Sequence, residues 1–261
     1  MLSSLRNPLA AALLAAGAGC AFAQAPAADA PSVTPYRPSV STPAALSAPG
    51  WLEVEAGLMR ERGDGGARRA SLPYTLKLAF SDDWGIRVGG DAVVTQRDMA
   101  GQRLRGVGDT GIVLKRRFAV DDDSAFGIEG GATVPTARTG IGSGKADYTV
   151  NGIYSADFGA WHTDLNLAAT RIGAVGAGES RRQLLWAASL SRALDERWGA
   201  VVELAGTRQR GVDRTAQLLG AISYNVSRSL TLDAGAARSI RSGSNDWSVF
   251  TGFTMLAGQL F

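Results

Sequence analysis

A group of hydroxyl, imidazole and carboxylate side chains is the first feature of this sequence that could carry out chemistry. His162 is the single histidine of the chain, and Ser155, Asp157 and Asp164 precede or follow it closely. A serine near a histidine and a carboxylate can form an activated nucleophile. These residues alternate along two segments joined by a turn at Gly159, so they would share one face of a hairpin.

Barrel enzymes that modify lipids expose such residues toward the membrane, whereas these fall on the polar face of the two segments. We therefore predict that the protein is not an enzyme. A lipid-modifying barrel enzyme using His162 stays as an alternative.

Charged and amide side chains recur on that same polar face along the whole chain, and we expect them to line the lumen of a barrel. They could select the solutes that pass, or form an internal salt-bridge network that only satisfies buried charge, and the sequence leaves both readings open. The predicted lumen-lining residues are Glu53, Glu55, Lys77, Arg87, Asp91, Asp109, Lys115, Arg117, Glu129, Asn151, Asp157, His162, Asp164, Asn166, Glu203, Gln217 and Asp233.

Two other segments only approach a known binding motif. The loop from Gly140 to Lys145 resembles a phosphate-binding loop, but Thr139 stands where the first glycine belongs and Ala146 replaces the Ser or Thr that would reach magnesium. The aspartate run at residues 121–123 lacks the spacing of a calcium loop. We expect no cofactor and no metal.

The charge balance argues against a nucleic-acid partner. The net charge is only +3, and no basic cluster forms a stripe that could follow a phosphate backbone.

The first residues have the pattern of an export signal. Arg6 precedes an apolar run over residues 9–18, and Ala21-Phe22-Ala23 is the small-x-small pattern of a cleavage site. The run is shorter than the roughly 20 residues that a membrane-spanning helix needs. We predict a signal peptide over residues 1–23. Cys20 would leave with it, so the mature chain could form no disulfide.

Residues 24–50 are rich in proline and alanine, and we predict that they form a periplasmic tail. Proline blocks the interiors of helices and sheets alike. Tyr36 and Arg37 could dock across the mouth of a barrel or into its lumen, but we expect mainly a solvated linker.

From Trp51 onward, apolar and polar residues alternate with the period of half-buried strands. One face of the second segment carries Leu72, Tyr74, Leu76, Leu78 and Phe80, and the other carries Ser71, Thr75, Lys77 and Ala79. In the next segment we place Ile86, Val88, Ala92 and Val94 opposite Arg87, Asp91, Thr95 and Arg97. About twelve such strands occur. A soluble sandwich or lipocalin-like barrel would turn the apolar face inward, but that face would fill so wide a lumen poorly.

Connection lengths alternate strictly between short turns and longer loops rich in Gly and Arg, for example residues 97–106. Short turns on one rim and long loops on the other are the layout of outer-membrane barrels. Aromatic residues gather near the short turns, as in an interfacial girdle. We predict an all-β, transmembrane, antiparallel up-and-down β-barrel over residues 51–261, located in the outer membrane in contact with its lipid.

The C-terminal Phe261 would close the last strand and be recognised by the barrel-assembly machinery. Gln259 departs from this signal, because two residues before the end an apolar residue is usual. The prediction of a barrel therefore depends mainly on the alternating faces and loop lengths.

The sequence also resembles a known family, on motifs spread over most of the mature chain. These are Tyr36-Arg37-Pro38-Ser39, then Ala48-Pro49-Gly50-Trp51-Leu52-Glu53-Val54-Glu55, Gly108-Asp109-Thr110, Pro135-Thr136-Ala137, Gly142-Ser143-Gly144-Lys145 and Asp147-Tyr148. They look like the outer-membrane, transporter-like proteins named for the meta-pathway of phenol degradation. The resemblance implies a Gram-negative outer-membrane barrel linked to passage of aromatic or other small hydrophobic compounds.

We expect a passive channel or transporter for small molecules. The alternative from another class is a structural or adhesive barrel with a closed interior.

Overall fold

The computed structural model describes residues 31–63, 66–98, 100–241 and 246–261. The predicted signal peptide and residues 24–30 lie outside the described residues. No helix among the described residues is long and apolar enough to cross a membrane.

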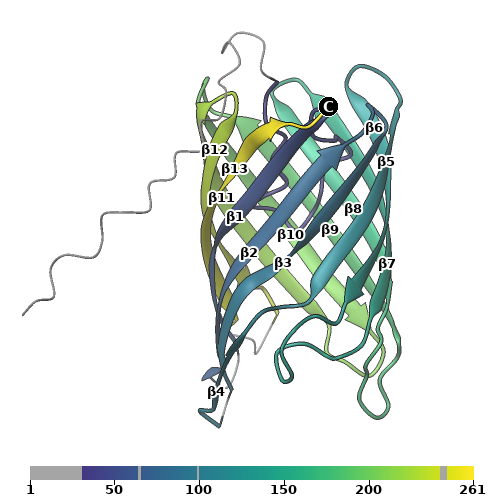
Figure 1. The fold of residues 1–261 in the computed structure, drawn as a ribbon, viewed down its shortest axis with the longest axis vertical. Coiled ribbons are helices and arrows are strands. Elements are labelled where there is room, and N and C mark those ends of the chain that lie inside the picture. The colour runs from purple at the N-terminus through teal and green to yellow at the C-terminus, as the bar shows by residue number, and fades with distance from the viewer. Residues whose placement is uncertain (1–30, 64–65, 99, 242–245) are drawn as a thin grey trace, which may run out of the picture. The chain divides into compact units, whose positions relative to one another are not determined.

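In the described part of the chain, twelve long antiparallel strands close into a barrel (Figure 1), which confirms the predicted fold. Each strand pairs with the next along the chain, and β1 pairs with β13 to close the ring. The strands are β1 (Trp51–Arg62), β2 (Arg68–Ala79), β3 (Trp84–Arg97), β5 (Thr110–Ala119), β6 (Ser124–Val134), β7 (Asp147–Phe158), β8 (Trp161–Arg171), β9 (Arg182–Ala193), β10 (Trp198–Gln209), β11 (Thr215–Ser227), β12 (Leu230–Ser239) and β13 (Trp247–Gln259).

A thirteenth strand, β4 (Arg103–Gly106), lies inside the predicted loop 97–106. It pairs with the end of β3 beyond the point where β5 leaves that strand, so it extends the sheet on the long-loop side. The sequence did not predict it, because four residues are too few to show an alternating pattern.

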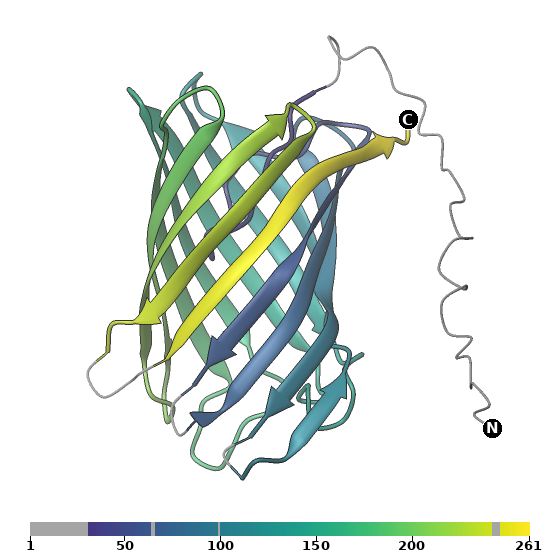
Figure 2. The same ribbon diagram turned by 90° about the vertical axis from the view of Figure 1, so that its left-hand side faces the viewer.

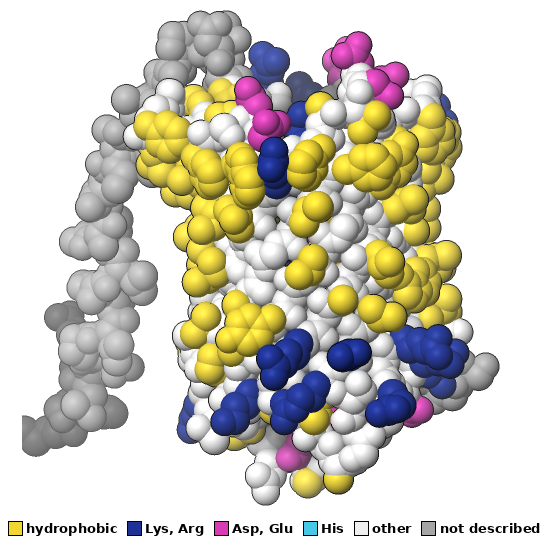
Figure 3. All heavy atoms as spheres, turned by 90° about the vertical axis from the view of Figure 1, so that its right-hand side faces the viewer, with side chains coloured by type: hydrophobic (Ala, Val, Ile, Leu, Met, Phe, Trp, Pro, Cys, Tyr) yellow, Lys and Arg dark blue, Asp and Glu magenta, His cyan; other side chains and the backbone are white. Residues whose placement is uncertain are grey.

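The distribution of apolar and polar side chains is inverted relative to a soluble protein. Leu58, Val150 and Leu167 are more than half exposed, while Glu53 and Glu203 are among the largest fully buried side chains. Apolar side chains cover much of the outer wall in Figure 3. An apolar exterior around a polar interior is the arrangement of a membrane barrel, so the soluble alternative does not hold.

The faces assigned to the last residues of β3 were wrong: Thr95 and Arg97, placed on the polar face, lie on the outer face with Val93. Val94 was placed on the apolar outer face, but its side chain is fully buried, and Val93 is exposed instead. The register between β2 and β3 shifts between Leu72 and Pro73, where Leu72 pairs with Val93 and Pro73 with Asp91. Such a bulge inserts one unpaired residue, here Ala92, and exchanges the two faces for the rest of the strand.

The short turns carry the aromatic side chains that the sequence placed there. The Phe126 and Tyr154 rings lie 5.0 Å apart, and those of Trp198 and Tyr224 lie 4.8 Å apart. In the turn before β10, the Asp195 carboxylate accepts the backbone N–H groups of Trp198 and Arg197. These hydrogen bonds lower the pKa of Asp195, so the turn is held by an ionised side chain.

The C-terminus joins the start of the first strand. The N–H of Leu260 donates to the carbonyl of Gly50, and the Gln259 side chain donates to the carbonyl of Phe261. The Phe261 side chain is exposed. Recognition of this end by the assembly machinery stays a prediction.

Candidate functional site: the lumen and its N-terminal segment

Residues 33–47, which we call the luminal segment, run inside the barrel. Ser41, Ala44 and Ser47 are buried to 3% exposure or less. Figure 2 shows this purple chain enclosed by the strands, at the end where the C-terminus lies. The expectation of a solvated linker is therefore wrong for these residues, and docking into the lumen is what the structure shows. The prolines keep the segment out of the sheet, so its remaining N–H groups need other acceptors.

Two carboxylates of β1 hold the first part of the segment. Glu53 accepts the N–H of Thr34 at 2.9 Å, and Glu55 accepts the N–H of Tyr36 at 2.7 Å. The Lys77 ammonium lies 2.5 Å from Glu53 and 2.6 Å from Glu55, and it also donates to the carbonyl of Thr34. All three charged side chains are almost fully buried, so this triad is both an ion pair and an anchor for the segment.

Tyr36 is clamped between two lysines. Its ring centroid lies 3.9 Å from Lys77 Nζ and 4.3 Å from Lys115 Nζ, which are cation–π distances. The phenol donates to the carbonyl of Ala45 at 2.7 Å and accepts from Lys115 at 3.1 Å. Lys115 also donates to the carbonyl of Pro43. Burial raises the pKa of Tyr36, so the phenol stays protonated and can keep donating.

Glu129 on β6 is the centre of a second network. Arg87 contacts its carboxylate at 3.1 Å and Lys115 at 3.5 Å, and the Asn151 amide donates to it at 3.0 Å. Asn166 accepts from Asn151 and exchanges hydrogen bonds with the backbone of Thr42. Thr42 also donates to Glu129, so the middle of the segment is bound directly to β6 and β8. Arg87 and Asn151 act on it through Glu129 and Asn166.

Glu203 and Asp233 bind the segment on the opposite wall. Glu203 accepts the N–H groups of Val40 and Ser41 and the hydroxyl of Ser41. The Arg37 guanidinium makes two hydrogen bonds to Asp233, each 3.0 Å long. A guanidinium that meets a carboxylate through two parallel bonds is among the stronger charged contacts in proteins.

The structure brings the candidate catalytic residues together, but not as a nucleophile with its base. Ser155 donates to Asp164 and accepts the N–H of Ala44. His162 contacts Asp164 through Nε2 at 3.1 Å and Asp157 through Nδ1 at 2.7 Å. Asp164 thus lies between the serine and the histidine, and the serine hydroxyl holds the luminal segment.

The other predicted lining residues lie outside these networks. Asp91 pairs with Arg69 at 2.5 Å, and Asp109 accepts the N–H of Ala137 at 2.9 Å. Arg117 is half-buried toward the short turns, and Gln217 lines cavities toward the long loops.

Sequence reasoning missed the donors that the segment itself supplies, above all Thr34, Ser41 and Thr42. One signal could have indicated them. The residues predicted for the lumen include nine carboxylates but only four basic side chains, so further donors had to come from elsewhere.

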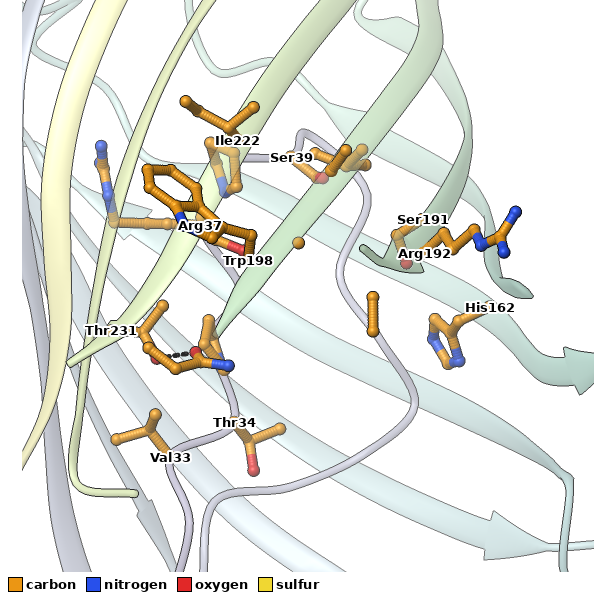
Figure 4. A pocket seen from close by; sticks show the side chains of 18 of the residues that line it. Val33, Thr34, Arg37, Ser39, His162, Ser191, Arg192, Trp198, Ile222 and Thr231 are labelled. Carbon is orange, nitrogen blue, oxygen red and sulfur yellow. Dashed lines mark hydrogen bonds between the residues drawn. The ribbon is translucent and has the colours of Figure 1, made fainter. Parts of the chain in front are cut away.

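Three cavities follow one another along the lumen. The first, of about 1030 Å³, opens at the short turns between the segment and β8–β12 (Figure 4). The second, of about 320 Å³, lies on the other side of the segment, and both are lined by Tyr36, Arg37, Pro38 and Ser39. The third, of about 580 Å³, lies among the long loops and shares Glu61 and Gln217 with the second. The luminal segment is thus the partition between the two ends.

No family model matches the chain, and no curated protein sequence matches it. The family suggested by the sequence motifs is therefore not confirmed.

Solved structures do match the fold. The COG4313 outer membrane channel from Pseudomonas putida F1 aligns with a TM-score of 0.63 at 14% identity, over 81% of this chain and 97% of that one. The NanC porin aligns with a TM-score of 0.56 at 8% identity, over 77% and 98%. The CymD monoaromatic hydrocarbon channel aligns with a TM-score of 0.51 at 8% identity, over 82% and 90%. The chain therefore folds as an outer-membrane β-barrel.

Proposed function

We propose that the protein is a passive outer-membrane channel for small solutes, whose path is narrowed by the luminal segment. The observation that carries this proposal is the succession of three cavities along the lumen, with residues 36–39 between the first and the second. A solute would enter among the long loops, pass the segment near Arg37 and Asp233, and leave by the wide cavity at the short turns. The predicted lumen-lining charges would then act on the solute as it passes.

The similarity to solved channel structures supports this proposal only at the level of the fold. The closed-barrel alternative has its own support in the dense hydrogen bonding of the luminal segment. The two readings differ in whether ions cross the barrel.

The test is the conductance of the purified barrel in planar lipid bilayers. We expect discrete openings for the wild type and a several-fold larger conductance after deletion of residues 33–47. A deletion could prevent folding, so a cross-link provides a second test. The Ala44 N–H donates to Ser155 Oγ at 2.7 Å, so a disulfide formed in the pair Ala44→Cys/Ser155→Cys would fix the segment to β7.

The oxidised pair should show a steady low conductance, and reduction should restore the wild-type trace. Ser155→Cys alone is the matched control, and reductant should leave its conductance unchanged. Absence of conductance in the wild type, the reduced pair and a folded deletion variant would establish the closed barrel.

For the solute class, we propose aromatic compounds that carry a charge or a hydrogen-bonding group. The sequence resemblance suggests aromatic compounds, and the charged partition favours polar members of that class over hydrocarbons. Liposome swelling with benzoate and uptake of toluene would separate the two. Faster entry of toluene than of benzoate, relative to liposomes without the protein, would contradict this proposal.

A further inference from the structure

Four arginines form a continuous row on the outer face of the barrel at its long-loop end. They lie on four neighbouring strands: Arg62 on β1, Arg68 on β2, Arg97 on β3 and Arg103 on β4. Each is directly opposite the next in the strand register. Side chains opposite one another on antiparallel strands share a face and have Cβ atoms about 5 Å apart. We call these four residues the arginine row.

The arginine row has no counter-charge within the part of the chain that the structure describes. All four side chains are exposed, and no ion pair or side-chain hydrogen bond joins any of them to another described residue. Like charges directly opposite one another destabilise a sheet. The row therefore causes an electrostatic repulsion. Either a negatively charged group outside the described residues offsets it, or it lowers the stability of the sheet.

The inner face of the same strands is different. There Glu61, Arg69 and Asp91 alternate in sign, with Arg69 3.4 Å from Glu61 and 2.5 Å from Asp91. The chain thus pairs its charges on the inside at this height and leaves a single sign outside.

The positive charge extends around this end of the barrel. Arg171 and Arg182 are also exposed and directly opposite each other, and Arg60 and Arg105 lie near the arginine row. Figure 3 shows dark blue side chains in a band below the apolar belt. The short turns, by contrast, contain the acidic runs at residues 82–83, 121–123 and 195–196. The basic band therefore lies at the long-loop end, where lipid headgroups meet the barrel.

We propose that the arginine row binds the phosphate groups of lipids in the leaflet that surrounds the long loops. A guanidinium presents a planar pair of donors that matches phosphate, and two neighbouring arginines can hold one phosphate between them. The lipid phosphate would supply the missing counter-charge while its acyl chains lie along the apolar wall. This site is on the outside of the barrel and is independent of whether the lumen conducts.

The test compares two double variants of equal charge. Arg68→Gln/Arg97→Gln removes the centre of the arginine row, and Arg116→Gln/Arg192→Gln removes two exposed arginines that lie over Trp84 and Trp161 near the short turns. Binding of bisphosphorylated lipid A and of its dephosphorylated form is measured for the full barrel in neutral detergent. Heat-dependent electrophoretic mobility confirms that each variant is folded.

We expect R68Q/R97Q to weaken binding of the phosphorylated lipid about 20-fold, on the scale of surface arginines at anionic membranes. The control pair should change it by less than about twofold. Arg68→Lys/Arg97→Lys should give an intermediate affinity, because charge remains but the two-bond geometry is lost. Equal loss in both double variants, or equal binding of the dephosphorylated lipid by the wild type, would overturn the proposal.

Thermal unfolding gives a second readout. In neutral detergent R68Q/R97Q should melt above the wild type, because all three directly opposed arginine pairs of the row are gone. Added lipid A should raise its melting temperature less than that of the wild type. A fall in the melting temperature of R68Q/R97Q without lipid would show that these arginines already have partners in the chain, and would equally overturn the proposal.

Discussion

Arg37 and Asp233 form a two-bond ion pair inside the barrel, although 196 positions separate them in the sequence. The guanidinium lies in a notch between β1 and β13. A Cβ added at Gly57 would come within 2.8 Å of Arg37 Nη2, and one added at Gly252 within 2.7 Å of Arg37 Nε. The two glycines therefore make room for the arginine, and the ion pair fixes the luminal segment at the seam where the barrel closes.

Breaking this ion pair should weaken the attachment of the luminal segment to the barrel wall. Arg37→Gln leaves Asp233 buried without its counter-charge, and we expect a loss of about 3 kcal/mol in the free energy of unfolding. The segment should also leave its place more often, so openings in planar bilayers should become larger or more frequent. Unfolding by denaturant in detergent and single-channel recording check the two effects.

The control for this prediction is the double variant Arg37→Gln/Asp233→Asn, which leaves no unpaired charge. It should recover part of the stability lost in R37Q. If each single variant were as stable as the wild type, the pair would not anchor the segment.

Glu203 should be a second anchor of comparable weight. Its carboxylate is fully buried and accepts three hydrogen bonds from Val40 and Ser41. Glu203→Gln keeps the shape but loses the charge that strengthens these bonds, so we expect a loss of about 2 kcal/mol. Ser41→Ala removes one donor and should cost about 1 kcal/mol. Denaturant unfolding gives the energies, and faster proteolysis within residues 33–47 should accompany them. Protease resistance unchanged in both variants would contradict this role.

The burial of Tyr36 leads us to predict that the stability of the barrel falls at alkaline pH. Burial raises the pKa of its phenol, so the folded state holds the proton more tightly than the unfolded state. Its contribution to stability is therefore fully present below the unfolded value of about 10 and is lost as the pH rises above it. The wild type should lose stability in this alkaline range faster than Tyr36→Phe does.

At neutral pH, Tyr36→Phe should lose about 1 kcal/mol through the missing bonds to Ala45 and Lys115. The ultraviolet absorbance of tyrosinate, compared between wild type and variant, reports Tyr36 directly. Ionisation of Tyr36 before the barrel unfolds would disprove the assignment of a buried, protonated phenol.

The two faces of the wall should respond oppositely to the same new charge. Leu167 is 64% exposed in the middle of β8, on the lipid side, and Leu167→Arg should cost about 2–4 kcal/mol in a bilayer. Ser191 lines the wide cavity on the inner face, so Ser191→Arg should leave stability nearly unchanged while altering conductance or ion selectivity. Refolding into lipid vesicles and bilayer recordings measure the two quantities. Equal destabilisation by both substitutions would mean that the faces have been assigned wrongly.

Much of the barrel is determined by the sequence itself. The period-two alternation in segments such as 71–80 and 161–167 fixes which side chains share a face, because a strand turns successive residues to opposite sides. Alternating short and long connections fix the two rims. Val94 marks the limit of this reasoning, because the bulge at Ala92 depends on the pairing with β2 and leaves the local pattern unchanged.

The luminal site, too, is determined partly by the sequence and partly by the tertiary structure. Period-two spacing identified Glu53, Lys77 and Glu203 as members of the inner face, but not the chain that they bind. Residues 33–47 have no periodic pattern, and their prolines indicate only what they cannot form. Their hydrogen-bond partners lie on β1, β2, β5–β8, β10 and β12, and these strands surround one lumen only when the barrel closes. The sequence alone thus determined a polar lumen with more carboxylates than basic side chains to pair with them. The tertiary structure decided that the luminal segment supplies hydrogen-bond donors to these carboxylates. Only closure of the barrel brings acceptors so distant in sequence around one buried, irregular segment.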